Sequence, residues 1–129
     1  MQDNEFDRNV ITDENVDEIM DTAGYGITYW ATSPTEGQLA KAPEDTSFVI
    51  VEDEEDGSGE VHYLTRDHIR DAFLKILGPE QTLVNDRVQG YLLAAWRDRD
   101  GEGIDTTHVD SDAADCIVQV AAFGRLVYG

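Results

Sequence analysis

The stretch that most constrains this chain is the apolar run 116–123, in which only Gln119 is polar. A helix that is apolar on all sides is usually buried by its neighbours. Alanines before and within the run favour helix and let other segments approach closely. The segment 110–112 offers polar residues as N-terminal caps, and Gly124 is a natural terminator. We therefore expect a central helix over residues 112–124, with the other segments packed against it.

Apolar residues at helical and strand spacings predict the remaining elements. We predict helices that follow Thr12, Thr65 and Asn85, and strands over residues 24–32, 47–52 and 61–64. Residues 33–45 are predicted as an irregular connection, and residues 1–10 as a loose start. This order predicts an α+β fold, a three-stranded antiparallel sheet covered by about four helices with the C-terminal helix central. The 129 residues suit a single domain, 1–129.

The formal net charge of −19 limits the partners that the chain can bind. Nucleic acid and anionic membrane surfaces would repel it, and no apolar run is long enough to span a bilayer. The acidic N-terminus differs from a signal peptide, so we expect a cytoplasmic protein. Two explanations of the charge stay open, adaptation to molar salt and imitation of a polyanion, and composition alone favours the first.

Two groups of acids are the predicted partner-binding residues. The first is a line along one face of the first helix, with neighbours ~5–6 Å apart, formed by Glu14, Asp17, Glu18 and Asp21. The second is the acidic part of the hairpin, from the end of its first strand into its turn, formed by Glu52, Asp53, Glu54, Glu55 and Asp56. Like charges at this helical spacing cost stability, so we expect the two groups to form one negative ridge with a binding function.

The loop 98–110 resembles the opening of an EF-hand calcium loop. Asp98, Asp100 and Glu102 place oxygen ligands at alternate positions, as a hard cation requires. The second half departs from the pattern, because Val109 stands where the bidentate carboxylate should be. Calcium binding is therefore an alternative hypothesis beside a plain acidic connection between helices.

The sequence contains few residues that indicate zinc binding or catalysis. His108 could group with nearby acids and Cys116, but the spacing matches no zinc pattern, and a buried inert thiol is the simpler interpretation of Cys116. No serine elbow, phosphate loop or dinucleotide fingerprint is present in the sequence, so we expect neither an enzyme nor a cofactor. Tyr29 is expected in the core, whereas Trp30 is a candidate for an exposed binding contact.

Short motifs at both ends of the chain carry a resemblance. The segment Gly24-Tyr-Gly-Ile-Thr-Tyr-Trp-Ala31, the pattern Asp112-x-x-Asp115 and the closing Leu126-Val-Tyr-Gly129 resemble a group of small, acidic, uncharacterised proteins encoded by phages and proviruses. The resemblance implies a viral setting and a role against host defence, such as that of anti-CRISPR proteins, which present carboxylates where a nuclease expects phosphates. These motifs are structural rather than catalytic.

These observations give one leading hypothesis and two alternatives. The leading one is a virus-type accessory protein in the host cytoplasm that binds a basic protein surface and blocks a nucleic-acid-targeting defence complex by DNA mimicry. The alternatives are a calcium-binding module and a salt-adapted domain whose acids serve only solvation.

Circular dichroism from near-zero to several molar sodium chloride separates salt adaptation from mimicry. The binding hypothesis expects the helical signal to persist in dilute buffer, because the charge is then not needed for survival in salt. Loss of the signal at low salt would show that the fold depends on screening of self-repulsion, and mimicry would lose its chief support.

Overall fold

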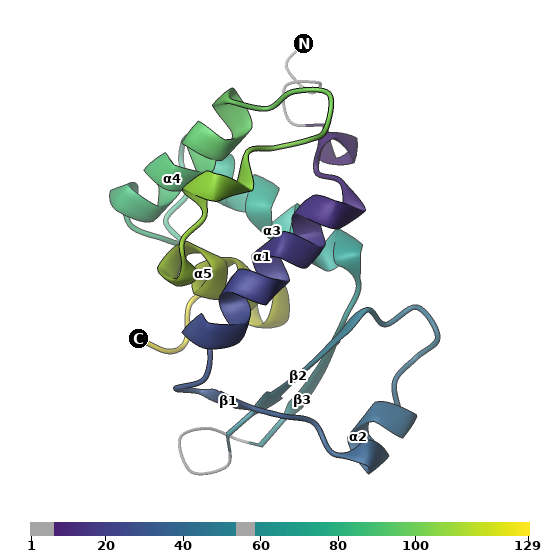
Figure 1. The fold of residues 1–129 in the computed structure, drawn as a ribbon. Coiled ribbons are helices and arrows are strands. Elements are labelled where there is room, and N and C mark those ends of the chain that lie inside the picture. The colour runs from purple at the N-terminus through teal and green to yellow at the C-terminus, as the bar shows by residue number, and fades with distance from the viewer. Residues whose placement is uncertain (1–6, 54–58) are drawn as a thin grey trace.

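The computed structural model describes residues 7–53 and 59–129, which form five α-helices and a three-stranded sheet (Figure 1). In chain order the elements are η2 (Arg8–Val10), α1 (Asp13–Gly26), β1 (Ala31–Thr32), α2 (Glu36–Ala40), β2 (Phe48–Glu52), β3 (Val61–Leu64), α3 (Arg66–Leu77), α4 (Asp86–Arg97), η3 (Thr106–His108) and α5 (Ser111–Phe123). The fold is α+β, as the order of the predicted elements indicates. Of the predicted loose start, residues 1–6 lie outside the described residues.

The C-terminal helix α5 is central, as predicted from its apolar run. It packs against α1, α3 and α4 and also contacts β3. The Asp110 side chain caps its start by accepting a hydrogen bond from the backbone N–H of Ala113. Gly124 ends the helix in the left-handed conformation, with φ 78°. Two polar residues of α5, Asp115 and Gln119, are buried among the apolar ones.

The apolar stripes predicted for α3 and α4 face the core. All five stripe residues of α3 are buried, and Thr65 caps the helix. On α4, four of the five are buried, and Tyr91 lies only partly inside. Local spacing was sufficient here because each helix buries one continuous stripe against α5 or its neighbour.

Residues 24–32 do not form the predicted strand. Helix α1 continues through Gly26, residues 27–30 form a turn, and only Ala31–Thr32 pair with β2. The physical reason is the close approach of α1 to α5, since a Cβ on Gly26 would lie 2.6 Å from the carbonyl oxygen of Ser111. This glycine serves helix packing rather than a chain reversal.

The sheet lies at one end of the helical layer (Figure 1), in the order β1-β2-β3 with antiparallel pairing. Phe48 pairs with Leu64 and Ile50 with His62, so these side chains share one face of the β2–β3 hairpin. Ile50 and Leu64 are buried in the same core as the helices. The predicted hairpin is thus confirmed, and its inner face joins the sheet to the helical layer.

The connection predicted as irregular contains the short helix α2. Thr35 and Gln38 form a capping box at its start, which the prediction missed. The Tyr63 hydroxyl donates to the backbone carbonyl of Gln38 over 2.9 Å and ties β3 to this helix.

Two glycines of α1 provide a matched pair of stability variants. Gly26→Ala should lower the free energy of unfolding by about 1–3 kcal/mol, because the new methyl group meets the backbone of α5. Gly24→Ala meets nothing within 4 Å and should raise it by about 0.5–1 kcal/mol. Urea denaturation followed by circular dichroism measures both. Equal effects of the two variants would contradict the packing of α1 on α5.

Candidate functional site: an acidic hollow beside α1

The buried side chain of Asn15 joins the start of α1 to the segment 98–106. Its Oδ1 accepts the backbone N–H of Thr12 and of Ile104, each over 3.0 Å, and Asn15 is only 4% exposed. Gly103, with φ 110°, lies so close that a Cβ would meet Asn15 Oδ1 at 2.0 Å. The segment 98–106 is therefore fixed on α1. Thr12 was predicted as the cap of this helix, but the role of Asn15 and its bond to Ile104 were not.

This attachment brings the acids of two separate segments around one hollow of about 380 Å³. The carboxylates that line it are those of Glu14, Glu18, Asp98, Asp100, Glu102 and Asp105. We call this set the acidic hollow. It unites half of the acids predicted on the first helix with all three residues predicted as calcium ligands.

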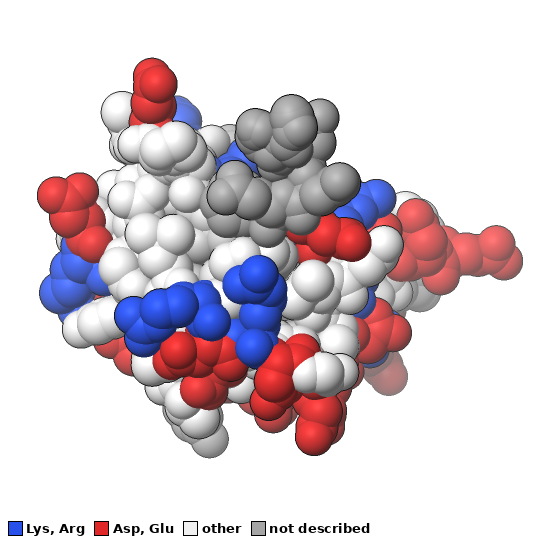
Figure 2. All heavy atoms as spheres, turned by 90° about the horizontal axis from the view of Figure 1, so that it is seen from above, with Lys and Arg blue, Asp and Glu red and all other residues white. Residues whose placement is uncertain are grey.

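Few cations neutralise the acidic hollow. Arg97 bonds to Asp98 over 3.1 Å, whereas Glu14, Asp100 and Glu102 form no ion pair within residues 7–53 and 59–129. Seen from above in Figure 2, carboxylates gather along the lower edge of this end of the molecule, below a group of basic side chains. The hollow thus keeps like charges together.

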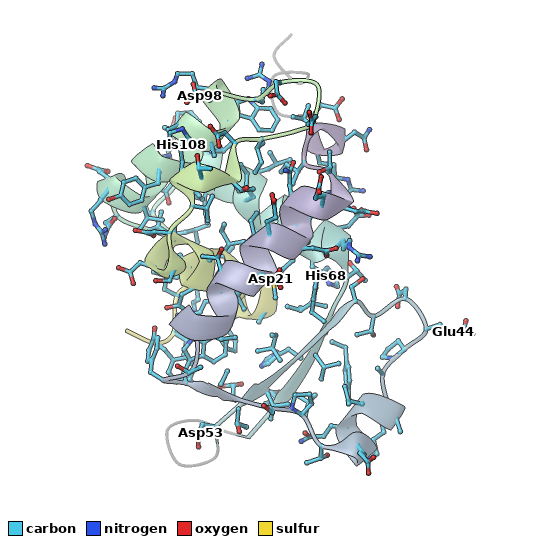
Figure 3. All side chains as sticks on the ribbon, in the orientation of Figure 1. Asp21, Glu44, Asp53, His68, Asp98 and His108 are labelled. Carbon is cyan, nitrogen blue, oxygen red and sulfur yellow. The ribbon has the colours of Figure 1, made fainter. Side chains whose placement is uncertain are left out.

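His108 on η3 lies between two carboxylates of the hollow. Its Nε2 is 2.8 Å from Asp98 Oδ2 and 3.7 Å from Asp105 Oδ2, and Figure 3 shows Asp98 and His108 side by side. Hydrogen bonds from Arg97 and then from His108 lower the pKa of Asp98 to about 2. Hydrogen bonds from Thr107 lower the pKa of Asp105.

The ligand atoms of Asp98, Asp105 and His108 lie within 4.8 Å of one another, and so do those of Glu52, Glu60 and His62. These two sets are the groupings in the described part of the chain that a metal ion could use. The sequence suggested grouping His108 with nearby acids, among them Asp105, but it did not add Asp98. It gave no sign of the set of Glu52, Glu60 and His62, because turns in the chain decide which of these residues meet.

The predicted calcium ligands do not form such a set. Asp98 turns to His108, and Asp100 Oδ1 accepts the backbone N–H of Glu102 over 2.7 Å. Asp100 and Gly103 exchange backbone hydrogen bonds of 2.9 and 3.2 Å, so the segment is a tight turn rather than an EF-hand loop. The segment thus differs from the EF-hand opening that the spacing indicates, and calcium binding by this loop stays a prediction.

The predicted ridge of helix and hairpin acids is also wrong for the described residues. Glu52 is 5% exposed, accepts a hydrogen bond from the Tyr128 hydroxyl and lies 2.9 Å from His62 Nε2. Figure 3 places Asp53 at the sheet end of the molecule, away from Asp21 of α1. The remaining hairpin acids, Glu54, Glu55 and Asp56, lie outside the described residues.

The other two acids predicted on the first helix face a different region. Asp17 pairs with Arg66 of α3 through oxygen to nitrogen distances of 3.1 and 3.3 Å. Asp17 and Asp21 line a second hollow, between α1 and β2. The structure therefore divides the predicted stripe between two sides of α1.

The aromatic prediction is reversed. Trp30 is fully buried and donates to Asp115 over 2.9 Å, so it is not a surface contact. Tyr29 is 47% exposed, although its hydroxyl donates to Asp115 over 2.7 Å. The strand alternation on which the prediction rested does not apply to a turn.

Cys116 was expected to be buried in the core, but on α5 it is only partly buried. Burial, followed by the charge of Asp115, raises the pKa of its thiol to about 11. The thiol is therefore neutral at physiological pH and a poor nucleophile.

Comparison of the chain with protein-family models, with curated proteins and with solved structures finds no match in any of the three. Within the described residues, every helix is too short or too polar to cross a bilayer.

The pairing of Asp98 gives a pH prediction. Its folded pKa of about 2 lies below the ordinary 3.8, so its stabilising effect is complete above pH 3.8 and is lost as pH falls through about 2. Arg97→Ala should raise this pKa most and His108→Ala less, whereas Arg99→Ala, whose guanidinium bonds to the Trp96 carbonyl, should leave it unchanged. Carboxyl ¹³C NMR titration measures all four proteins. A wild-type midpoint near the ordinary value would contradict the geometry.

Proposed function

We propose that this protein is a binding protein rather than an enzyme, and that its acidic hollow receives a basic surface of a partner protein. The observation that carries the proposal is the convergence of six carboxylates from α1 and the segment 98–106. Glu14, Asp100 and Glu102 have no intramolecular ion pair among the described residues, so they can pair with Lys or Arg side chains of another protein.

The arrangement of the charges supports a partner that normally binds nucleic acid. Glu14 and Glu18 stand one helical turn apart, at a spacing of ~5–6 Å. Duplex DNA carries one charge per ~1.7 Å of axis, and a surface lined with Lys and Arg releases counterions when it binds either polyanion. Charges in a concave site also reinforce one another and steer association.

The resemblance to phage and provirus proteins supports the finer part of the proposal. We place the protein in the cytoplasm of a host cell, as a viral accessory protein that blocks nucleic-acid access to a defence complex. The calcium alternative has less support, because the grouped ligands include the nitrogen of His108 and calcium prefers an all-oxygen set.

Two matched sets of amide variants test the proposal. The hollow set is Glu14→Gln, Glu18→Gln, Asp100→Asn and Glu102→Gln, in which the amide oxygen preserves the hydrogen bonds that Glu18 accepts from Thr106 and Asp100 from the backbone. The control set removes the same number of charges from exposed acids elsewhere, Glu36→Gln, Glu44→Gln, Glu80→Gln and Asp86→Asn. Both sets change the net charge from −19 to −15, which is −19 plus four.

The probe is a labelled oligo-arginine peptide, free or bound to duplex DNA, followed by fluorescence anisotropy in moderate salt. We expect the wild-type protein to bind the peptide and displace the DNA, and the hollow set to bind about tenfold more weakly, ~1.4 kcal/mol. The control set should lose about twofold or less. Equal losses in both sets would show that net charge alone acts, as in a surface adapted only to salt.

A further inference from the structure

The second hollow of α1 runs along an open edge of the sheet. Strand β1 contributes only Ala31 and Thr32, which pair with Glu52 and Val51, so β1 covers one end of β2. If β1 continued in this register, residue 34 would face Val49. That residue is Pro34, which has no N–H to donate, and the chain leaves the sheet there.

The pairing register shows which backbone groups of β2 face this edge. The N–H of Glu52 donates to β3, at Glu60, and the N–H of Asp53 donates to Trp30, beside β1. Because antiparallel strands alternate in this way, Ile50 directs its N–H and C=O to β3, whereas Val49 directs them to the open edge. Within the described residues, Val49 has no backbone partner on that side.

Two adjacent hollows of about 620 and 160 Å³ follow this edge and share several lining residues. One wall is α1 and the other is β2, through Met20, Asp21 and Gly24 and through Phe48, Val49 and Ile50. We call them together the edge groove. Its shape and its free N–H and C=O groups suit an extended chain that adds to the sheet as a strand.

Charge indicates which extended chain fits. Asp21 lies in the groove wall and forms no ion pair within the described ranges, and the last turn of α1 has no basic residue. The negative charge of Asp21 therefore adds to the negative end of the helix dipole. A cation beside Asp21 would offset the charge of its carboxylate and that of the helix end. The aliphatic part of a Lys side chain of the bound segment can lie over Met20 while its ammonium group reaches Asp21. A second copy of this chain, with net charge −19, is disfavoured by repulsion.

We infer that the edge groove binds an extended, basic segment of a partner protein, which pairs with Val49 as an added β-strand and places a Lys or Arg side chain at Asp21. This surface is separate from the acidic hollow, and the inference does not depend on the function proposed for the hollow.

The probe is an acetylated and amidated peptide of alternating Lys and Val residues, added to the intact protein. In the free protein, amide hydrogen exchange measured by NMR should be fast at Val49 and slow at Ile50. The peptide should slow exchange at Val49 about tenfold or more and leave Ile50 unchanged, since only Val49 gains a partner. Protection of Val49 in the dilute free protein would overturn the inference, as would no change on adding the peptide.

A pair of variants separates backbone pairing from general attraction. Val49→Pro removes the donor that faces the open edge, although its ring also fixes φ, and should abolish binding. Val49→Ala keeps that donor and should bind normally. Asp21→Asn should weaken binding severalfold. If a folded Val49→Pro variant bound as tightly as Val49→Ala, the inference would be wrong.

Two further peptides keep the test decisive if Val49→Pro does not fold. A peptide methylated at alternate backbone nitrogens cannot pair with the edge, and a Glu–Val peptide lacks the positive charge, so neither should bind. Binding of either one as tight as that of the Lys–Val peptide would overturn the inference. So would protection of Val49 that rises with protein concentration alone, because the occupant would then be a second copy.

Discussion

The packing of the end of α1 on the central helix α5 depends on the carboxylate of Asp115. This residue is 8% exposed, yet it accepts hydrogen bonds from the Tyr29 hydroxyl at 2.7 Å and from Trp30 Nε1 and Gln119 Nε2, both at 2.9 Å. A buried carboxylate destabilises a fold unless its oxygens are satisfied in this way. Because the donors come from the turn after α1 and from α5, Asp115 fixes the end of α1 on the central helix.

The same polar network continues into the sheet. Gln119 Oε1 accepts the backbone N–H of Val127 at 2.8 Å and of Tyr128 at 2.9 Å, which holds the C-terminal segment against α5. The Tyr128 hydroxyl then donates to Glu52 of β2, and Glu52 also bonds to His62 of β3. Glu52 was predicted as one of several exposed acids of the hairpin, but its hydrogen bonds in this network hold its carboxylate inside the protein. Only the folded chain brings these partners together.

Local signals were enough for α3, α4 and α5, since caps and apolar spacing act within a few residues. They failed at residues 24–32, because Gly26 is placed by its contact with Ser111 of α5, far along the chain. The candidate site likewise has one part that local signals predicted and one part that they did not. Helical spacing and the acidic loop identified its members, but their meeting depends on the hydrogen bonds between Asn15 and Ile104, which join positions 89 residues apart. A single sequence has no pattern that reports such a bond.

The distribution of arginine bears on why the acids of the hollow are there. On the α3 side of α1, Arg70 bonds to Asp13 and Asp67, so the negative charges there are paired. In the acidic hollow, Glu14 and Glu18 repel each other and face the acids of the segment 98–106. Solvation in salt needs exposed carboxylates but gives no reason to gather them in a concave site at a cost in stability. Sites that bind a partner commonly carry such a cost, and a basic surface would remove it.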